Sequence, residues 1–155
     1  MKLFAYGTLM TREGFQGALG DQAASLSFRP ARLIGWRRIW NASREGWDGG
    51  ILNVERHPDG EVWGVLVEGL TGAGVARLDS QESTHLPRES VFVEVDGGEH
   101  VAAEMYWLRH GLSTERPSSR YEGIVLARAR EAGPRVLENL RTGSVDATGE
   151  PRRLS

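Results

Sequence analysis

The stretch LFAYGTL at residues 3–9 organises the fold, because an apolar run stops abruptly at a glycine. A short apolar run bounded by a turn residue is typical of a buried strand, so we expect residues 3–6 to form the first strand and to lead into a loop. A glycine in this place can turn backbone N–H groups outward into a nest that holds a carboxylate or a developing oxyanion. An ordinary tight turn is the alternative interpretation.

Further apolar runs between turn residues predict more strands over the first two thirds of the chain. Residues 31–40 suggest one or two strands. Residues 49–54 and 61–68 are expected to pair as a hairpin about the turn signal HPDG at 57–60, where proline sets one φ angle and glycine accepts a positive one. A second hairpin is expected from residues 90–95 and 101–108, around DGG at 96–98.

Helical patterns lie between the expected strands and dominate the end of the chain. We expect a weak helix at 11–19, a helix at 71–82 capped by Thr71, and helices at 121–132 and 134–140 separated by Gly133-Pro134. Strands followed by helices are typical of an α+β fold, here a closed or nearly closed sheet with helices packed on it. A length of 155 residues suits one domain. We expect it to span residues 1–140, with 141–155 as a polar, loosely held C-terminal tail.

Composition excludes several classes of function. The formal net charge is −2, with Lys and Arg scattered, which argues against nucleic-acid and membrane-surface partners. The absence of cysteine excludes disulfides, thiol nucleophiles and cysteine metal sites. No apolar run approaches the roughly 18 residues of a membrane helix, and the apolar N-terminal run is too short for a signal peptide. We therefore expect a cytoplasmic protein.

The expected helix at 71–82 carries an acidic residue on its apolar stripe. At about 100° per residue Val75 and Leu78 define the stripe, and Glu82 follows them by seven and four positions. A carboxylate on a buried face is costly unless it is paired or protonated, and burial makes it a stronger base. Glu82 is therefore a candidate general base. Alternatively, Glu82 lies at a frayed helix end facing water, and Asp79 near the stripe is a capping or structural carboxylate.

Two other patterns compete with this interpretation, and a third is absent. Glu82 and His85 have the Glu-x-x-His spacing of carboxylate metal sites, but only one copy exists and Pro87 argues against a continuing helix. The glycines of 69–74 lie where a dinucleotide loop would, but Arg77 stands in place of the third glycine. There is no Gly-x-Ser-x-Gly elbow of a serine hydrolase. The tryptophans are expected to form core and cavity walls: Trp36, Trp40, Trp47, Trp63 and Trp107.

Four motifs in order resemble those of γ-glutamylcyclotransferase-like (AIG2-like) proteins, over roughly residues 3–140. Residues 6–9, Tyr-Gly-Thr-Leu, resemble the family's Tyr-Gly-Ser/Thr-Leu loop, and residues 78–82 resemble the segment that ends in its catalytic glutamate. Residues 47–51 and 61–65 look like the central strands. Residues 118–121, with the helix after them, resemble the C-terminal part.

The resemblance implies a mixed β-barrel flanked by helices and a cofactor-independent enzyme that holds no metal. It implies that Glu82 is the acid/base, that Tyr121 contacts the substrate, and that the substrate loop is formed by Tyr6, Gly7, Thr8 and Leu9. The chain departs from the true cyclotransferases where Thr8 replaces a common serine, Leu9 a frequent asparagine, and Ser83 a frequent glycine. These departures leave the identity of the substrate open.

The implied reaction is the intramolecular cyclisation of a small γ-glutamyl compound to 5-oxoproline, with release of an amine or amino acid. A related cyclotransferase would act on a γ-glutamylamine or on an acylated biosynthetic intermediate. The rival from another class is a non-catalytic small-molecule-binding or regulatory domain on the same scaffold. The sequence does not determine the leaving group or the oligomeric state, and a homodimer is compatible with it.

Overall fold

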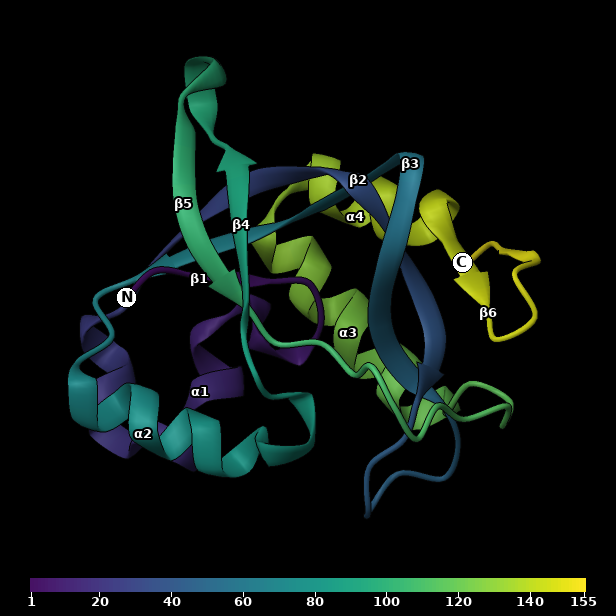
Figure 1. Cartoon of the computed structure of the whole chain (residues 1–155), viewed down its shortest axis with the longest axis horizontal. Coiled ribbons are helices and arrows are strands. Elements are labelled where there is room, and N and C mark those ends of the chain that lie inside the picture. The colour runs from purple at the N-terminus through teal and green to yellow at the C-terminus, as the bar shows by residue number, and fades with distance from the viewer.

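A computed structural model describes residues 1–155 and contains a closed five-stranded barrel (Figure 1). Around the barrel the order is β3-β1-β5-β4-β2, and β2 pairs with β3 to close it. The pairs are antiparallel except that β1 runs parallel to β5, so the barrel is mixed, as the resemblance implied. The strands are β1 (Leu3–Ala5), β2 (Ser27–Ala42), β3 (Ile51–Glu68), β4 (Glu89–Glu94) and β5 (His100–Met105).

Four α-helices pack on this barrel: α1 (Arg12–Leu19), α2 (Gly72–Gln81), α3 (Ser119–Ala132) and α4 (Pro134–Gly143). In Figure 1, α1 and α2 lie together on one side, and α3 and α4 lie behind the long strands. The start of α2 follows the prediction, since the Gly74 N–H donates to the Thr71 hydroxyl at 3.0 Å. None of the helices combines the length and the apolar character that crossing a bilayer requires.

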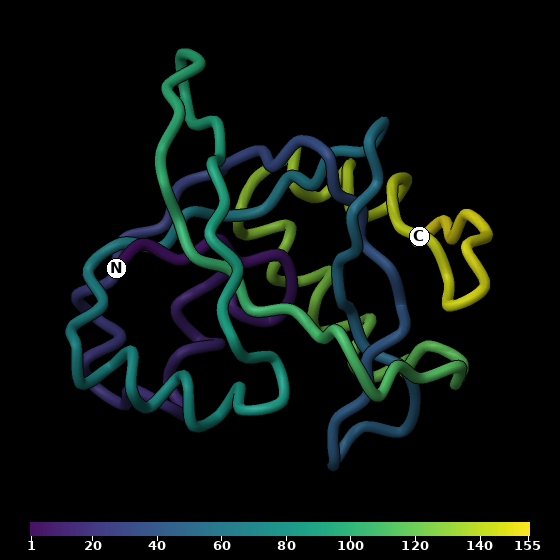
Figure 2. Tube along the Cα trace, viewed as in Figure 1, coloured from purple at the N-terminus to yellow at the C-terminus, as the bar shows by residue number.

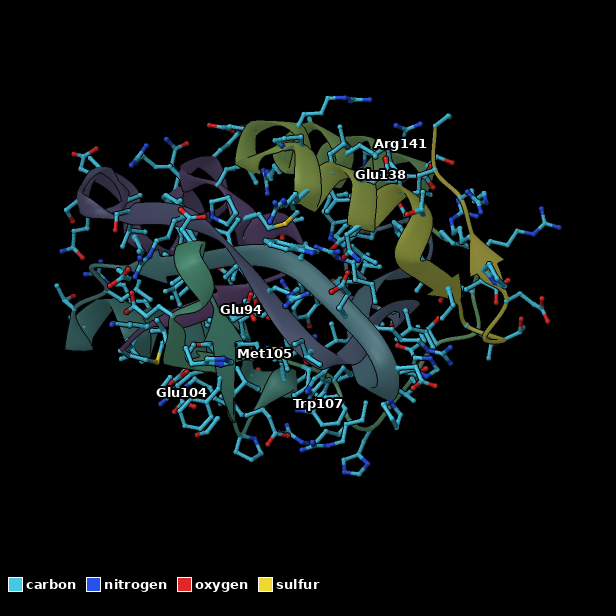
Figure 3. The ribbon with its side chains drawn as sticks, turned by 90° about the horizontal axis from the view of Figure 1, so that it is seen from above. Glu94, Glu104, Met105, Trp107, Glu138 and Arg141 are labelled. Carbon is cyan, nitrogen blue, oxygen red and sulfur yellow. The ribbon has the colours of Figure 1, made fainter.

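The β4–β5 hairpin forms around residues 96–98 as expected, and its turn projects beyond the rest of the trace (Figure 2). Its side chains alternate, as the period of two requires. Met105 of β5 is fully buried, whereas its neighbour Glu104 is half-buried and lies 4.0 Å from Arg88 Nε. Both β5 residues are labelled in Figure 3. This hairpin is therefore an ordinary half-buried part of the barrel wall.

The expected hairpin about residues 57–60 is wrong. Residues 51–68 are one continuous strand that pairs with β2 from Ile51↔Ala42 to Glu68↔Ser27. Between the pairs Ile34↔Glu61 and Trp36↔Arg56 a single residue of β2, Gly35, faces the four residues 57–60. The turn signal therefore produces a bulge instead of a reversal, and a bulge bends the strand. The sharply curved β2–β3 ribbon of Figure 1 is the result.

The expected loose tail at 141–155 is also wrong. Its first three residues complete α4, and the rest form β6 (Ser144–Asp146) and β7 (Pro151–Arg152). Strand β6 runs parallel to β2, at Ile39↔Val145 and Trp40↔Asp146. Two apolar residues, Val145 and Leu154, are buried. Arg141, which lies near the end of α4 (Figure 3), exchanges hydrogen bonds with Leu154. The burial of Val145 and Leu154 and the pairing of β6 with β2 thus hold this mostly polar segment against the barrel.

Candidate active site

A cavity of about 180 Å³ opens where β1 ends, and all six residues of the predicted site line it: Tyr6, Gly7, Thr8, Leu9, Glu82 and Tyr121. Three distant parts of the chain supply them, namely the loop after β1, the end of α2 and the start of α3. The wall is largely apolar, with Trp47, Ile51, Leu52 and Ile124 among its members. The barrel and the packed helices bring together side chains that no local structure could.

The loop after β1 has each of its first three carbonyls engaged. The Tyr6 carbonyl accepts from Arg38 Nε at 2.9 Å, that of Gly7 from the Met10 N–H at 3.2 Å, and that of Thr8 from Arg128 Nη1 at 2.6 Å. Across a trans peptide the C=O and the N–H point in opposite directions. The N–H that follows each of these carbonyls therefore points away from the group that donates to the carbonyl. The Gly7 N–H makes no hydrogen bond within the protein and is available to a ligand.

Arg38 supports this loop from the core. Its side chain is almost fully buried, and it also donates to the Trp63 carbonyl at 2.6 Å and to Asn139 Oδ1 at 2.7 Å. Burial lowers the pKa of Arg38 to about 10, so it is still protonated at neutral pH. A positive charge without a carboxylate partner therefore lies behind the Tyr6 peptide.

Two glycines allow the loop to pack closely against helices. A Cβ at position 7 would lie 2.9 Å from the Tyr121 hydroxyl oxygen. A Cβ at position 14, in α1, would lie 2.0 Å from the Thr8 carbonyl oxygen. Both distances are shorter than van der Waals contact, so the loop occupies space that only glycine leaves open.

Glu82 caps the C-terminus of α2, where its N–H donates to the Leu78 carbonyl at 2.7 Å. It is buried with 6% exposure, and Leu78 on the same stripe is fully buried, so the burial expected from the periodicity is confirmed. The carboxylate contacts Arg44 Nη2 and lies 3.8 Å from His85 Nδ1. The buried carboxylate therefore lies between one cation and one imidazole.

Arg44 and Trp47 reach the cavity on the loop between β2 and β3, residues 43–50. This loop is fastened to the start of α3, because Ser118 Oγ donates to Asp48 Oδ1 at 2.6 Å and Ser118 N–H to the Gly50 carbonyl at 2.9 Å. The hydrogen bond from the Ser118 hydroxyl holds the pKa of Asp48 below its usual value. The resemblance to a central strand of the family suggested that residues 47–49 form part of a strand. They lie instead in the loop, and β3 begins at Ile51.

The two predicted tyrosines form walls with different polar ends. The Tyr6 hydroxyl donates to the Tyr106 carbonyl at 2.7 Å, so it already has its partner. The Tyr121 ring is held edge-on between Trp40 and Trp47, at centroid distances of 5.9 and 5.0 Å. Burial raises the pKa of both hydroxyls, so they stay neutral and offer hydrogen bonds rather than charge.

His85 is buried beside Glu82, and burial lowers its pKa below the ordinary value, so it is neutral near pH 7. Its Nδ1 lies 3.0 Å from the Thr84 hydroxyl. The residue that completes the Glu82–His85 pair is the cation Arg44, not a third metal ligand. No group of three or more His, Cys, Asp or Glu side chains is placed to hold a metal ion.

The cavity contains residues that the sequence analysis did not assign to the site. Ile124 and Arg128 lie three and seven positions after Tyr121 on α3, and this helical spacing is a signal that could have identified them. Trp47 was expected as a core or cavity wall, and it lines the cavity. Arg44 gave no such signal, because it lies on a loop whose position depends on contacts with a distant helix.

The sequence of this chain is similar to those of known proteins. The sequence profile of the family described as "Gamma-glutamyl cyclotransferase, AIG2-like" matches residues 3–124. The "Gamma-glutamylcyclotransferase" of Bos taurus is 30% identical over 93 residues, which are 57% of this chain and 48% of that protein. The chain therefore spans about half the length of this curated relative.

Solved structures of similar shape agree. One described as "Gamma-glutamyl cyclotransferase" superposes with a TM-score of 0.78 at 25% identity, over 90% of this chain and 85% of that one. An uncharacterized protein from Homo sapiens superposes with a TM-score of 0.77 at 26% identity, with the same coverage.

Proposed function

Because the chain belongs to the gamma-glutamyl cyclotransferase, AIG2-like family, we propose that it converts a γ-glutamyl amino acid or a γ-glutamylamine into 5-oxoproline and releases the amine. The observation that carries the proposal is the shared cavity of the Glu82 carboxylate and the loop of residues 6–9. A base and the unpaired Gly7 N–H facing one small space suit an acyl transfer without a covalent nucleophile.

In the proposed reaction the α-amine of the substrate attacks its own γ-carbonyl carbon. A C–N bond forms to close the five-membered lactam, and the original amide C–N bond breaks. Nucleophile and electrophile belong to one molecule, so folding the substrate into the attacking shape supplies a large effective molarity. The apolar wall around Tyr121 and Trp47 would hold the chain in that shape.

Glu82 would carry the proton between the two nitrogens. The amine arrives as an ammonium group, which cannot attack, so Glu82 first accepts its proton and later delivers a proton to the departing nitrogen. The Gly7 N–H, turned away from Arg38 and free of other bonds, would donate to the oxygen that becomes negative during attack. The charge of Arg38 behind that peptide would favour the same negative oxygen.

The first test replaces Glu82 by glutamine, which keeps the size of the side chain and removes the base. Purified protein is screened with γ-glutamyl amino acids, glutathione and γ-glutamylamines, and 5-oxoproline is assayed. We expect Glu82→Gln to lose about 10²–10⁴-fold in turnover, because general acid–base catalysis contributes that much. We expect its binding of 5-oxoproline to persist.

Glu55→Gln is the matched control, since Glu55 pairs with Arg37 at 2.7 Å outside the cavity. We expect this variant to turn over at the wild-type rate. Wild-type activity in Glu82→Gln would contradict the assigned role. Ligand binding by the wild-type protein without any 5-oxoproline release would favour the alternative, a non-catalytic binding domain.

A further inference from the structure

The unliganded cavity contains a cation and an anion that are paired with each other. Glu82 contacts Arg44 Nη2, and the structure gives the Arg44 guanidinium no other side-chain partner. The second arginine of the cavity wall, Arg128, is occupied by the Thr8 carbonyl at 2.6 Å. Arg38 lies behind the loop and does not line the cavity. Arg44 is therefore the cavity cation whose charge a ligand can meet.

This pair has the charge pattern opposite to that of an α-amino acid head. A γ-glutamyl compound carries an ammonium and a carboxylate on the same carbon, while the cavity offers a carboxylate and a guanidinium in contact. A zwitterion that enters between them turns one ion pair into two, so no charge is left unpaired in a partly buried site. Arginine suits the carboxylate side, because its planar fork matches a carboxylate with two parallel hydrogen bonds.

We propose that Arg44 determines specificity for the α-carboxylate of the substrate and leaves Glu82 when that carboxylate binds. The inference rests on the proposed function, since it takes the ligand to be a γ-glutamyl compound. While Arg44 contacts the Glu82 carboxylate, it occupies an oxygen that could otherwise meet the ligand's ammonium group. Transfer of Arg44 to the ligand therefore frees Glu82 to receive the ammonium proton. It also leaves the N–H groups of residues 7–9 for the carbonyl oxygen.

The surroundings of Arg44 allow this exchange. Its side chain is 32% exposed, whereas that of Glu82 is 8% exposed, so the arginine is the more accessible partner. The loop of residues 43–50 is fastened through Asp48, Gly50 and Gly46, and none of these bonds involves the guanidinium of Arg44. The side chain can therefore swing from Glu82 to a ligand while the loop stays in place.

The test removes the charge from each side of the proposed contact in turn. Dissociation constants of L-norvaline, which carries the α-ammonium and the α-carboxylate but no γ-carbonyl to be attacked, and of its α-amide, L-norvalinamide, are measured by calorimetry for the wild type, Arg44→Met and Arg44→Lys. Arg37→Met is the matched control, because the Arg37 side chain is about as exposed as that of Arg44 and pairs with Glu55 outside the cavity. Circular dichroism verifies that each variant is folded, and Arg44→Lys supplies the answer if Arg44→Met does not fold.

We expect the wild type and Arg37→Met to prefer the carboxylate by about 10–100-fold, as for a hydrogen bond between charged groups. Arg44→Met should bind both ligands about equally, and Arg44→Lys should keep part of the preference because it keeps the charge without the fork. With the γ-glutamyl compound turned over fastest, Arg44→Met should raise KM more than it lowers kcat.

The outcomes separate this inference from the proposed function. If Arg44→Met and Arg44→Lys keep the full preference for the carboxylate while Glu82→Gln loses turnover, the role of Arg44 is overturned. The proposed cyclotransferase activity then stands. Preference that depends on Arg44, without turnover of any γ-glutamyl compound, supports a carboxylate-binding role and overturns the enzyme. Absence of carboxylate preference in the wild type overturns the inference in either case.

Discussion

Gly7 and Tyr121 fit together so closely that neither position tolerates a larger residue. A Cβ at position 7 would lie 2.9 Å from the Tyr121 hydroxyl oxygen. The ring cannot withdraw freely, since Tyr121 is almost fully buried and held edge-on between Trp40 and Trp47. At the scale of the residue, one missing methyl group therefore decides where the first loop and the start of α3 meet.

Replacing Gly7 by alanine should destabilise the protein by about 1–3 kcal/mol, the usual cost of overpacking a filled site. It should also impair turnover, because the loop peptide has to move. Urea denaturation measures the first effect and a 5-oxoproline assay the second.

Tyr121→Phe removes the oxygen that the new methyl group would strike. The double variant Gly7→Ala with Tyr121→Phe should therefore recover much of the stability that Gly7→Ala loses. Additive losses in the double variant would show that the clash lies elsewhere.

At the scale of the element, the loop between β2 and β3 depends on a helix cap. Ser118 is buried, and its hydroxyl accepts from the Tyr121 N–H at 3.2 Å as the N-cap of α3. The same hydroxyl donates to Asp48 Oδ1 at 2.6 Å, in the loop that carries Arg44 and Trp47 into the cavity. One side chain thus starts a helix and fastens a loop of the candidate site.

Ser118→Ala should lower stability by about 1 kcal/mol, as the loss of a cap does, and should also weaken ligand binding. Thr71→Ala is the matched control, because Thr71 caps α2 through the Gly74 N–H and has no bond to the loop. Thermal denaturation should show a loss in both variants, and the larger loss in Ser118→Ala, which also gives up the bond to Asp48. Only Ser118→Ala should raise the KM for a γ-glutamyl substrate, and an equal KM in the two would contradict the link between cap and loop.

At the scale of the whole molecule, the C-terminal segment completes the outer side of the bent β2–β3 ribbon. Strand β6 pairs with β2, and Ser144 Oγ accepts from the buried Trp40 indole N–H at 3.1 Å. Val145 and Leu154 are buried at 8% and 5% exposure. The residues expected to be loose therefore cover the tryptophan that supports Tyr121 in the cavity wall.

A chain that ends at Gly143 should lose roughly 4–9 kcal/mol of unfolding free energy, from two buried apolar side chains and one buried donor left without a partner. Chemical denaturation followed by tryptophan fluorescence measures the loss. A chain that lacks only the exposed Ser155 is the control and should match the wild type. Equal stability of the two shortened chains would mean that β6 and β7 contribute nothing to the fold.

The local pattern predicted most elements and the burial of one acidic residue. Alternation and turn residues located β1 and the β4–β5 hairpin, a capping threonine located α2, and the helical period placed Glu82 on a buried stripe. These features depend on neighbours within a few positions, which the sequence displays directly. The turn signal at 57–60 misled because the same residues suit a reversal and a bulge, and only pairing with β2 selects between them.

What the sequence determined by itself was therefore the set of elements and, through family resemblance, six residues that meet in one cavity: Tyr6, Gly7, Thr8, Leu9, Glu82 and Tyr121. Their proposed roles remain to be tested by the variants above. The partner of Glu82, the course of β3 and the place of the C-terminal strands became known from the folded molecule alone. The physical reason is that each of these depends on contacts between segments far apart in the chain, whose free energy belongs to the closed barrel and to no short stretch of sequence.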